Sequence, residues 1–432
     1  MIESVAKSLN DDASLKFNVM SKVTCHKECD VAIIGSGPAG LSAAVELRRQ
    51  GIERVWVFER ETEAGGIPRH CAHPPYGIRE YKRLMTGPDF ARRNTEEAGK
   101  AGVTIFTRHT VVELKPGGEL YLTSPEGPMV VSAHRVLLAV GARETPRSAR
   151  LISGSRPIGV INTGTLQSEI YLKNLKPFER PLIIGTELVS LSAIWSCLKA
   201  GIRPVGMVEA NPRPTARWPL HWFPQLCRVP LYLNTMLESI EGDKRVVGAW
   251  LSLGNGKKKY IECDGILLSG QFTPESSLLR LSSLEVDPNS QGPCVDQFFR
   301  CSDPAYYAAG NLLRPIETAG WSWREGKRIA GYINDDLNGK LPSPTASMIS
   351  VKCEPPIKYC LPQKLIVGAQ SKIDLQLRVT RRTHGTLTLQ AGECILWRRT
   401  RTFLPERRIL ISLDKLVWPE TTQLDVTIRE TR

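Results

Sequence analysis

The 432-residue sequence predicts an α/β protein with two parallel-sheet domains and a C-terminal all-β domain. An apolar run at residues 31–34 precedes a glycine-rich turn and a helical pattern at 41–49. The same order recurs at 182–184 and 188–199, about 150 residues further on. Strands that are apolar on both faces belong to parallel sheets covered by helices, so the two units predict two Rossmann-like dinucleotide-binding domains.

The last fifth of the chain has a different pattern. Short segments of alternating polar and apolar residues are separated by turn residues, which is typical of an all-β sandwich or barrel. These predicted strands are 372–380, 386–390, 394–402, 409–413 and 423–429. The sequence therefore predicts a polar leader at 1–28, a discontinuous first domain at 29–150 and 265–342, a second domain at 151–264 and a sandwich-like β domain at 343–432.

The net charge of the chain narrows the classes of partner that it could bind. The chain carries 57 Lys and Arg against 44 Asp and Glu, and residues 343–432 hold 15 and 8 of these. A net charge of +13 favours an acidic partner, an anionic membrane surface or an anionic substrate, and we predict no nucleic-acid partner. No apolar run reaches the roughly 18 residues of a membrane span, which leaves only peripheral membrane contact open.

The 11 cysteines are scattered and include no C-x-x-C pair. This spacing argues against a disulfide framework, a zinc ribbon and an iron-sulfur site. Free thiols fit a reducing compartment, so we predict a cytoplasmic protein without a bound metal.

A glycine motif links the first predicted strand to its helix. Residues 35–40 read G-S-G-P-A-G, and Glu59 ends the next predicted strand 19 residues after Gly40. Gly35 makes the tight turn, Gly37 lets the backbone approach a pyrophosphate at the helix N-terminus, and Gly40 lets helix and strand pack closely. Glu59 can accept ribose hydroxyls, so this segment predicts a dinucleotide site.

Three further blocks make the chain resemble the flavoproteins of the glutathione-reductase type, which have two dinucleotide-binding domains. The blocks are Gly65-Gly66 after the acidic residue, the strand end at 136–141 and the Ala-Gly-Asn block at 305–311. The resemblance covers roughly residues 29–341. It implies that the first glycine motif binds FAD, and we expect the FAD to be held non-covalently.

The resemblance also implies roles for single residues. Val111 resembles the residue whose backbone meets the adenine, and Gly310 and Asn311 resemble the ribitol-binding pair. Asn311 stands where the family has Asp, and its amide can still bind a hydroxyl. A helix starting near Thr318 to Trp321 would point its positive end at the flavin pyrimidine ring and stabilise the anionic reduced flavin. The expected FAD-binding residues are Gly35, Gly37, Pro38, Ala39, Gly40, Glu59, Arg60, Gly66, Arg69, Val111, Ala139, Gly141, Gly310, Asn311, Thr318 and Ala319.

The second glycine motif, at residues 185–190, keeps only its first glycine. Glu187 falls where a bare backbone should touch pyrophosphate, so it adds bulk and a like charge at the anion site. Ser190 replaces the third glycine and is small enough to be tolerated, and Glu209 still ends the following strand. We predict that the NAD(P) site is lost, with a weakened site as the alternative.

The segment after Gly66 holds the candidate catalytic residues His70, Cys71 and His73. The functional interpretations are a general base at one of the two histidines or an anion-binding Arg69. The alternative is a proline-rich loop whose polar groups satisfy backbone atoms. No second thiol lies close by, so we do not expect disulfide-reductase chemistry.

Two aromatic segments and the β domain complete the candidates. Residues 213–222 interleave Arg with Trp and favour a packing or docking surface. Trp321 and Trp323 are expected around the isoalloxazine. The basic β domain, with His384 in a turn, is expected to dock an acidic partner and to be dispensable for FAD binding.

These blocks also resemble the FAD-containing larger subunits of octopine and nopaline oxidase, hydrogen cyanide synthase and dye-linked proline dehydrogenase. Many of those carry a Cys-rich segment near the C-terminus, where this chain has a β domain. The resemblance implies an FAD-dependent oxidoreductase within a heteromeric dehydrogenase or oxidase. It would oxidise a small amine, amino acid or hydroxy acid and pass electrons through a second flavoprotein or electron-transfer subunit to an acceptor other than NAD. The alternatives are an NAD(P)H-dependent flavin reductase and a non-catalytic flavoprotein scaffold.

Overall fold

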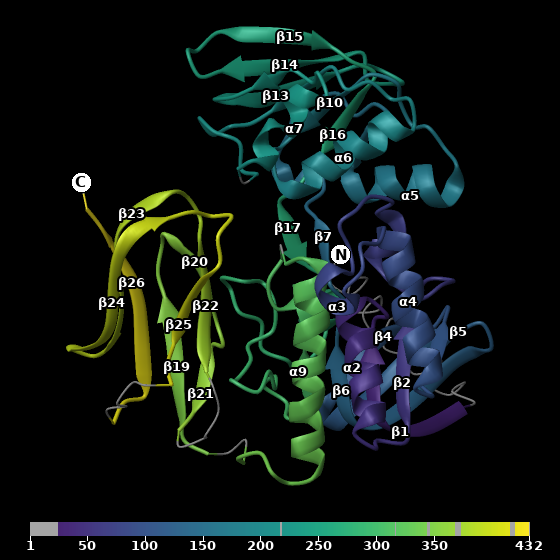
Figure 1. Cartoon of the computed structure of the whole chain (residues 1–432), viewed down its shortest axis with the longest axis vertical. Coiled ribbons are helices and arrows are strands. Elements are labelled where there is room, and N and C mark those ends of the chain that lie inside the picture. Colours follow the sequence, from purple (N-terminus) through teal and green to yellow (C-terminus); the bar gives the residue numbers. More distant parts are fainter. Residues whose placement is uncertain are drawn as a thin grey trace, which may run out of the picture.

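The computed structural model describes residues 25–431 except 217, 316, 344–345, 368–372 and 415–419. Figure 1 shows three bodies: a first domain that includes the long helix α9 (Ala319–Leu337), a second domain above it, and a β domain beside α9. The second domain contains a parallel sheet, the sheet of the first domain is parallel except for its antiparallel strands β4 and β5, and the third body contains only strands. The predicted fold class is therefore confirmed.

The first domain is built on a seven-stranded sheet with the order β3-β2-β1-β6-β5-β4. Strand β1 lies between β2 and β6 and is parallel to both, and the second half of β6 also pairs with β18. The strands are β1 Cys25–Ile34, β2 Val55–Glu59, β3 Thr104–Thr107, β4 Thr110–Lys115, β5 Glu119–Ser124, β6 Gly127–Leu138 and β18 Tyr306–Ala308.

Helices α2 (Pro38–Arg49), α4 (Gly87–Lys100) and α9 pack on one face of this sheet. Val31 and Ile33 point into that core and are fully buried, whereas Ala32 and Ile34 face the opposite core. Each fully buried aliphatic side chain contributes about 1.5–3 kcal/mol. The apolar run predicted at 31–34 is thus explained by burial on both faces of the strand.

Strand β1 begins at Cys25, which corrects the predicted leader for residues 25–28. Cys25 pairs with Met129 of β6, and the pairing continues without a break to Ile34. The side chains of His26, Lys27 and Glu28 are exposed, so their polarity hides the strand from a hydrophobicity pattern. The backbone hydrogen bonds to β6 hold this segment whatever its side chains are.

The second domain contains a parallel sheet with the order β12-β11-β10-β16-β9 and an antiparallel meander β13-β14-β15 edged by β8. Helix α6 (Leu188–Lys199) spans the residues predicted for it. The other elements are β8 Ser153–Gly154, β9 Val160–Asn162, α5 Thr163–Lys173, β10 Pro181–Ile184, β11 Gly206–Val208, α7 Phe223–Leu226, β12 Leu231–Tyr232, β13 Thr235–Glu241, β14 Gly248–Leu253, β15 Lys258–Glu262 and β16 Gly265–Leu268.

The boundary predicted at residue 265 is wrong, because β16 lies in the second domain. It pairs with β10 and β9 as an inner strand of that sheet. The chain crosses between the domains in a two-stranded ribbon of β7 (Ala142–Glu144) and β17 (Phe272–Pro274). An apolar strand fits either parallel sheet equally well, so its composition could not assign it.

The β domain consists of two facing sheets, with the orders β21-β19-β26-β23-β24 and β20-β22-β25. Its strands are β19 Met348–Cys353, β20 Ile357–Leu361, β21 Lys364–Ile366, β22 Asp374–Val379, β23 Thr383–Ala391, β24 Cys394–Phe403, β25 Ile409–Ser412 and β26 Gln423–Glu430. Five of these match predicted strands. His384 lies within β23 rather than in a turn, and a Cβ on Gly385 would come within 2.3 Å of the Arg429 carbonyl oxygen. Because Gly385 has no side chain, β23 can pack closely against β26 at this position.

The β domain does not stand apart from the first domain. Tyr359 and Leu361 of β20 belong to the same buried core as Ala32 and Ile34 of β1. The Gln363 side chain accepts a hydrogen bond from Val295 N at 3.0 Å. This shared core argues against the expected dispensable docking module.

Candidate flavin and active site

Three separate segments meet at the N-terminus of α2 and form what we call the glycine cradle: Gly35 with Gly37, Gly66, and Gly310. Gly35 has φ +100°, and a Cβ there would lie 2.6 Å from the Ala139 carbonyl oxygen. A Cβ on Gly66 (φ +64°) would lie 2.8 Å from Cα of Gly37. The predicted FAD residues from these distant segments are therefore brought together.

The cradle leaves room for an anion at Gly37. Gly37 is the N-cap of α2, no described side chain caps that helix end, and no described atom lies within 4 Å of the position of a Cβ. Pro38 occupies the first helical turn, where a missing N–H costs nothing. By contrast, a Cβ on Gly40 would lie 2.0 Å from the Gly35 carbonyl oxygen. The open helix end fits the pyrophosphate of a dinucleotide.

Glu59 organises the turn below the cradle. Its carboxylate accepts hydrogen bonds from Ser36 N at 3.0 Å, Ser36 Oγ at 2.6 Å and Glu61 N at 3.0 Å. A carboxylate has about four acceptor positions, so one remains for a ribose hydroxyl. His109 N donates to the Glu59 carbonyl, which brings the segment of Val111 to the same end of the sheet. Arg60 points outward and pairs weakly with Glu61 at 3.8 Å.

Ala139, Gly141, Gly310 and Asn311 lie where β6 and β18 end. Ala139 N donates to the Ile34 carbonyl, and Gly141 (φ +77°) turns the chain toward β7. Gly310 (φ +71°) lies against Ala39, and its N–H donates to Glu325 at 2.7 Å. These positions fit the expected flavin-binding set.

Asn311 binds the loop that begins α9. Its Oδ1 accepts from Glu317 N at 2.9 Å, and its Nδ2 donates to the Glu317 carbonyl at 3.2 Å. Thr318 is the N-cap of α9 and Ala319 its first residue, as predicted. No described side chain caps this helix end, so its N–H groups are available to an acceptor such as a flavin carbonyl.

The short helix η1 (Ile67–His70) carries the first of the candidate catalytic residues. Arg69 folds over Gly65, and its guanidinium donates to the Glu63 carbonyl at 2.8 Å. His70 Nδ1 is buried and has no hydrogen-bond partner among the described residues. Burial, reinforced by the Arg69 charge, lowers the pKa of His70 below its ordinary 6.5. His70 is therefore neutral at pH 7 and has a ring nitrogen to spare.

The contacts of Cys71 and His73 argue against a catalytic role for these two residues. The Cys71 thiol donates to Gln167 Oε1 at 3.5 Å, and burial raises the pKa of Cys71 to about 11. A thiol with that pKa is protonated at pH 7 and is a poor nucleophile. His73 Nδ1 lies 2.9 Å from the Pro74 carbonyl. Gln167 belongs to α5 of the second domain, and no motif in the sequence predicted its contact with Cys71.

The second glycine motif is closed by its own side chains. The Glu187 carboxyl lies against Gly270, where a Cβ would come within 2.6 Å of its Oε1, and accepts from Gln271 N at 3.3 Å. Burial raises the pKa of Glu187. Ser190 Oγ donates to Ser269 Oγ at 2.9 Å, which fills the place of the third glycine.

Glu209, the counterpart of Glu59, has no acceptor position left. It accepts from Thr186 Oγ1, from Thr215 Oγ1 at 3.4 Å, and from Asn211 N and Nδ2 at 2.9 and 2.7 Å. A ribose hydroxyl would have to displace one of these four donors.

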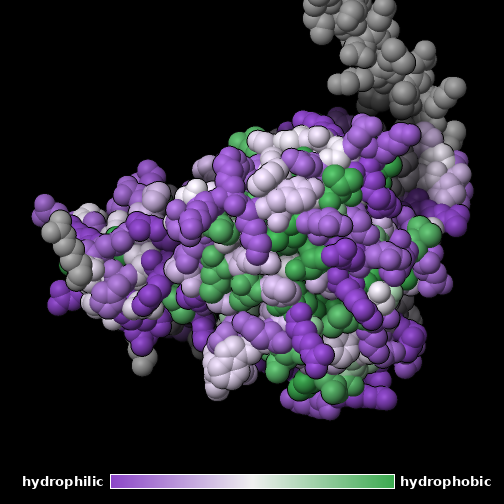
Figure 2. All heavy atoms as spheres, turned by 90° about the horizontal axis from the view of Figure 1, so that it is seen from above, coloured by the Kyte–Doolittle hydropathy of each residue, from purple (hydrophilic) through white to green (hydrophobic). Residues whose placement is uncertain are grey.

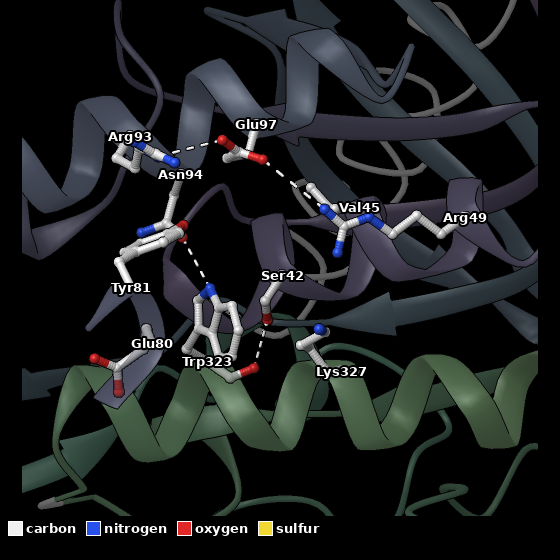
Figure 3. Close-up of a pocket in the computed structure, with 10 residues that line it drawn as sticks. All are labelled: Ser42, Val45, Arg49, Glu80, Tyr81, Arg93, Asn94, Glu97, Trp323 and Lys327. Atoms are coloured by element: carbon white, nitrogen blue, oxygen red, sulfur yellow. Dashed lines mark hydrogen bonds and ion pairs between the residues drawn. The ribbon is translucent and has the colours of Figure 1, made fainter. Parts of the chain in front are cut away.

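A cavity of about 270 Å³ lies between α2, α4 and α9, away from the cradle (Figure 3). Trp323 points into it and donates through Nε1 to Asn94 at 2.9 Å, so its indole does not line the cradle as expected. Glu97 pairs with Arg93 at 3.2 Å and with Arg49 at 3.8 Å. Because its polar lining groups largely satisfy one another, we assign it no ligand.

The described residues contain neither a metal-binding cluster nor a membrane-spanning helix. No group of three or more His, Cys, Asp or Glu side chains there is arranged to hold a metal ion. No helix in the described part of the chain is long and apolar enough to cross a membrane.

An open glycine cradle in one Rossmann-like domain beside a second such domain defines an FAD-dependent oxidoreductase of the two-domain flavoprotein class. Residues 29–326 match the model of the pyridine nucleotide-disulphide oxidoreductase family, and the chain belongs to that family. Members of this family bind FAD.

Two curated relatives illustrate the range of the family. Mitochondrial dihydrolipoyl dehydrogenase of Pongo abelii is 24% identical over 326 residues, which cover 66% of this chain and 62% of the relative. The glutamate synthase [NADPH] small chain of Mycobacterium tuberculosis is 25% identical over 360 residues, 73% of this chain and 68% of the relative. The chain thus spans less than two thirds of the length of the first relative.

Solved structures show the same fold. Thioredoxin reductase of T. acidophilum superposes with a TM-score of 0.60 and 22% identity, over 72% of this chain and 99% of that one. L-proline dehydrogenase of P. horikoshii has a TM-score of 0.54 and 18% identity, over 74% of this chain and 57% of that one. At these identities the likeness extends to the fold alone.

Proposed function

We propose that this protein is the FAD-containing component of a heteromeric dehydrogenase or oxidase. It oxidises a small amine, amino acid or hydroxy acid and passes the electrons to an acceptor other than NAD. The observation that carries the proposal is the contrast between the open Gly37 and the closed Glu187, two equivalent positions of the two domains. One domain keeps an anion site at its helix N-terminus, and the other has filled it.

The residues of the first domain divide the binding of FAD among them. The N-terminus of α2 at Gly37 would hold the pyrophosphate, and Glu59 would accept a ribose hydroxyl. Gly310 and the N-terminus of α9 would face the flavin end of the molecule. Bound FAD supplies acceptance of a hydride from the substrate carbon.

His70 is the proton acceptor in this proposal. When a hydride leaves the carbon of an amine or alcohol, the N–H or O–H proton must also leave, so that a C=N or C=O bond forms. A neutral imidazole with an unpaired ring nitrogen can take that proton. Cys71 and Gln167 hold the segment of His70 against the second domain.

The electrons would leave through a partner protein, either a second flavoprotein or an electron-transfer subunit. Figure 2 shows hydrophobic side chains gathered on the face formed by the second domain. Trp218 and Trp222 of the second domain are 73% and 54% exposed, although large aromatic side chains are normally buried. Aromatic residues are enriched at the centres of protein interfaces, which supports a docking role for residues 213–222. The mycobacterial relative is named as a small chain, which also suits a subunit.

Anaerobic reduction of the flavin tests the proposal. The purified protein should contain FAD, which a small amine, amino acid or hydroxy acid bleaches and NADPH or NADH does not. His70→Gln should slow bleaching by substrate roughly 100-fold while leaving FAD content unchanged, because a glutamine cannot take a proton. His73→Gln is the matched control and should bleach at the normal rate.

Rapid bleaching by micromolar NADH would instead establish the alternative, an NAD(P)H-dependent flavin reductase. The retained strand-turn-helix of the second domain, with Gly185 at φ +109°, is what favours that alternative. If no reductant or candidate substrate bleaches a fully loaded flavin, the protein is a scaffold and the proposal is wrong.

A further inference from the structure

Glu317 lies one residue before the N-cap of α9, and its side chain is only 4% exposed. Its carboxylate accepts from Arg378 at 3.1 Å and from Arg408 at 2.5 Å. Gln376 donates to the same carboxylate at 3.2 Å. All three donors come from the β domain: two from β22 and one from the residue before β25.

The backbone of Glu317 connects the same residue to the first domain. Both its N–H and its carbonyl bind the Asn311 side chain, and Thr318 starts α9 immediately afterwards. The Arg408 guanidinium also lies 3.8 Å above the ring of Trp321 in the first turn of α9. Glu317 therefore joins the β domain to the loop that faces the flavin end of the cradle.

The charges of this cluster do not cancel. Arg378 and Arg408 face the single carboxylate of Glu317. The neighbouring Arg314 forms an ion pair with Glu325 at 2.5 Å, so these two charges neutralise each other. Around Gly320, in the first turn of α9, the Glu80 carboxyl and Arg324 add one charge of each sign. One excess positive charge therefore remains next to a helix N-terminus, which adds a partial positive charge of its own.

We propose that Arg378 and Arg408 of the β domain hold Glu317 so that the N-terminus of α9 presents a net positive field to the flavin. The proposal rests on the FAD-binding function proposed above. Glu317 is a positioning residue in it, because it acts through Asn311 and α9. The field favours the negative charge that the flavin pyrimidine ring gains on reduction, and so raises the flavin midpoint potential.

Two substitutions in the full-length protein should move that potential in opposite directions. Glu317→Gln keeps the shape of the side chain, removes the negative charge and raises the potential. Arg408→Gln removes a positive charge and lowers it. We expect each variant to change the ratio of affinities for reduced and oxidised flavin about tenfold, which is ~30 mV for a two-electron couple. A purely structural role would weaken FAD binding in both variants without shifts of opposite sign.

Arg213→Gln provides the matched control. Arg213 joins the second domain to the β domain through two hydrogen bonds of 3.1 Å to Glu406, so its loss loosens a domain contact two residues from Arg408 without removing a charge that pairs with Glu317. Its flavin potential should equal that of the unmodified protein. Potentials are measured by equilibration with redox dyes, and FAD affinity by fluorescence titration of the apoprotein.

Shifts of the same sign, or shifts no larger than that of Arg213→Gln, would overturn the proposal. If Arg408→Gln loses its flavin during purification, Glu317→Gln decides: a potential above that of Arg213→Gln supports the proposal, and an equal or lower one refutes it. An unmodified protein that binds no FAD would refute the proposed function, which is a separate result.

Discussion

The two Rossmann-like units of this chain share a backbone and differ at one position of the turn. The first runs from β1 through Gly37 to α2, and the second from β10 through Glu187 to α6. Both keep a first glycine in the left-handed region, Gly35 at φ +100° and Gly185 at φ +109°. Both end the following strand in a buried glutamate. The difference is the side chain at the N-cap of the helix: Gly37 has none, and Glu187 has a buried carboxyl that lies against Gly270 and makes no cap hydrogen bond to α6.

Under our proposal that the second unit has lost its NAD(P) site, its fold has survived that loss. A glycine motif serves both packing and binding, and the two uses fall on different positions. The first glycine shapes the turn, and the chain keeps it in both units. The second glycine only admits a phosphate, so its replacement by Glu187 leaves strand and helix in place. The raised pKa of Glu187 is the physical cost of burying an acid in that space.

Removal of the β domain should have the largest effect, because this domain contacts both units. A chain ending at Leu341 loses Tyr359 and Leu361 from the core of the first domain and leaves the Glu317 carboxylate without its two arginines. We expect a protein without flavin and with weakened near-UV circular dichroism. A truncated protein with one FAD per chain and an unchanged melting temperature would support the prediction that the β domain is a dispensable docking module.

Gly37→Val makes the first unit resemble the second. No described atom lies within 4 Å of the new Cβ, and φ is −72°, so the apoprotein should melt within a few degrees of the unmodified apoprotein. FAD affinity should fall roughly 100-fold, because the branched side chain fills the approach of the pyrophosphate. Gly40→Val is the control for packing and should destabilise the fold itself by about 1–3 kcal/mol or more. Full FAD occupancy in Gly37→Val would contradict the assignment of the first motif.

The reverse exchange, Glu187→Gly with Ser190→Gly, makes the second unit resemble the first. It removes the buried carboxyl and the hydroxyl that binds Ser269, which frees the N-terminus of α6. We expect the affinity for NADPH to rise about tenfold in calorimetric titration, a modest gain because Glu209 still binds four donors of its own chain. Ser190→Gly alone should leave the affinity unchanged. A double variant without any gain would show that the site was lost elsewhere.

The smallest effect concerns the stability of the second unit. The folded state raises the pKa of Glu187 above its ordinary 4.5, so wild type loses stability as the pH rises through and beyond that value. Glu187→Gln carries no titrating group and should melt at a higher temperature than wild type at pH 8, by about 1 kcal/mol in unfolding free energy. The two proteins should melt together near pH 4. Equal melting at both pH values would mean that the carboxyl ionises freely.

The parts predicted correctly are those that leave a local pattern. Helix α6 follows from its apolar spacing between residues 188 and 199, and the N-cap of α9 at Thr318 follows from the flavoprotein resemblance. Gly35 and Gly37 of the glycine cradle follow from the strand-turn-helix pattern, whereas Gly66 and Gly310 were expected from the flavoprotein resemblance. The assignments of β16, the start of β1 and the surroundings of His384 failed, because their side-chain patterns suit more than one environment.

The sequence by itself determined two parallel-sheet units, a β domain, a dinucleotide motif and its broken copy, since these are written in the spacing of neighbouring residues. Only the tertiary structure decided which groups act together. Glu317, Arg378 and Arg408 are separated by up to 91 residues, and Cys71 and Gln167 by 96. No periodicity connects such positions, because their contact depends on how whole sheets pack. The same packing left His70 with a free ring nitrogen and made the β domain a structural neighbour of α9.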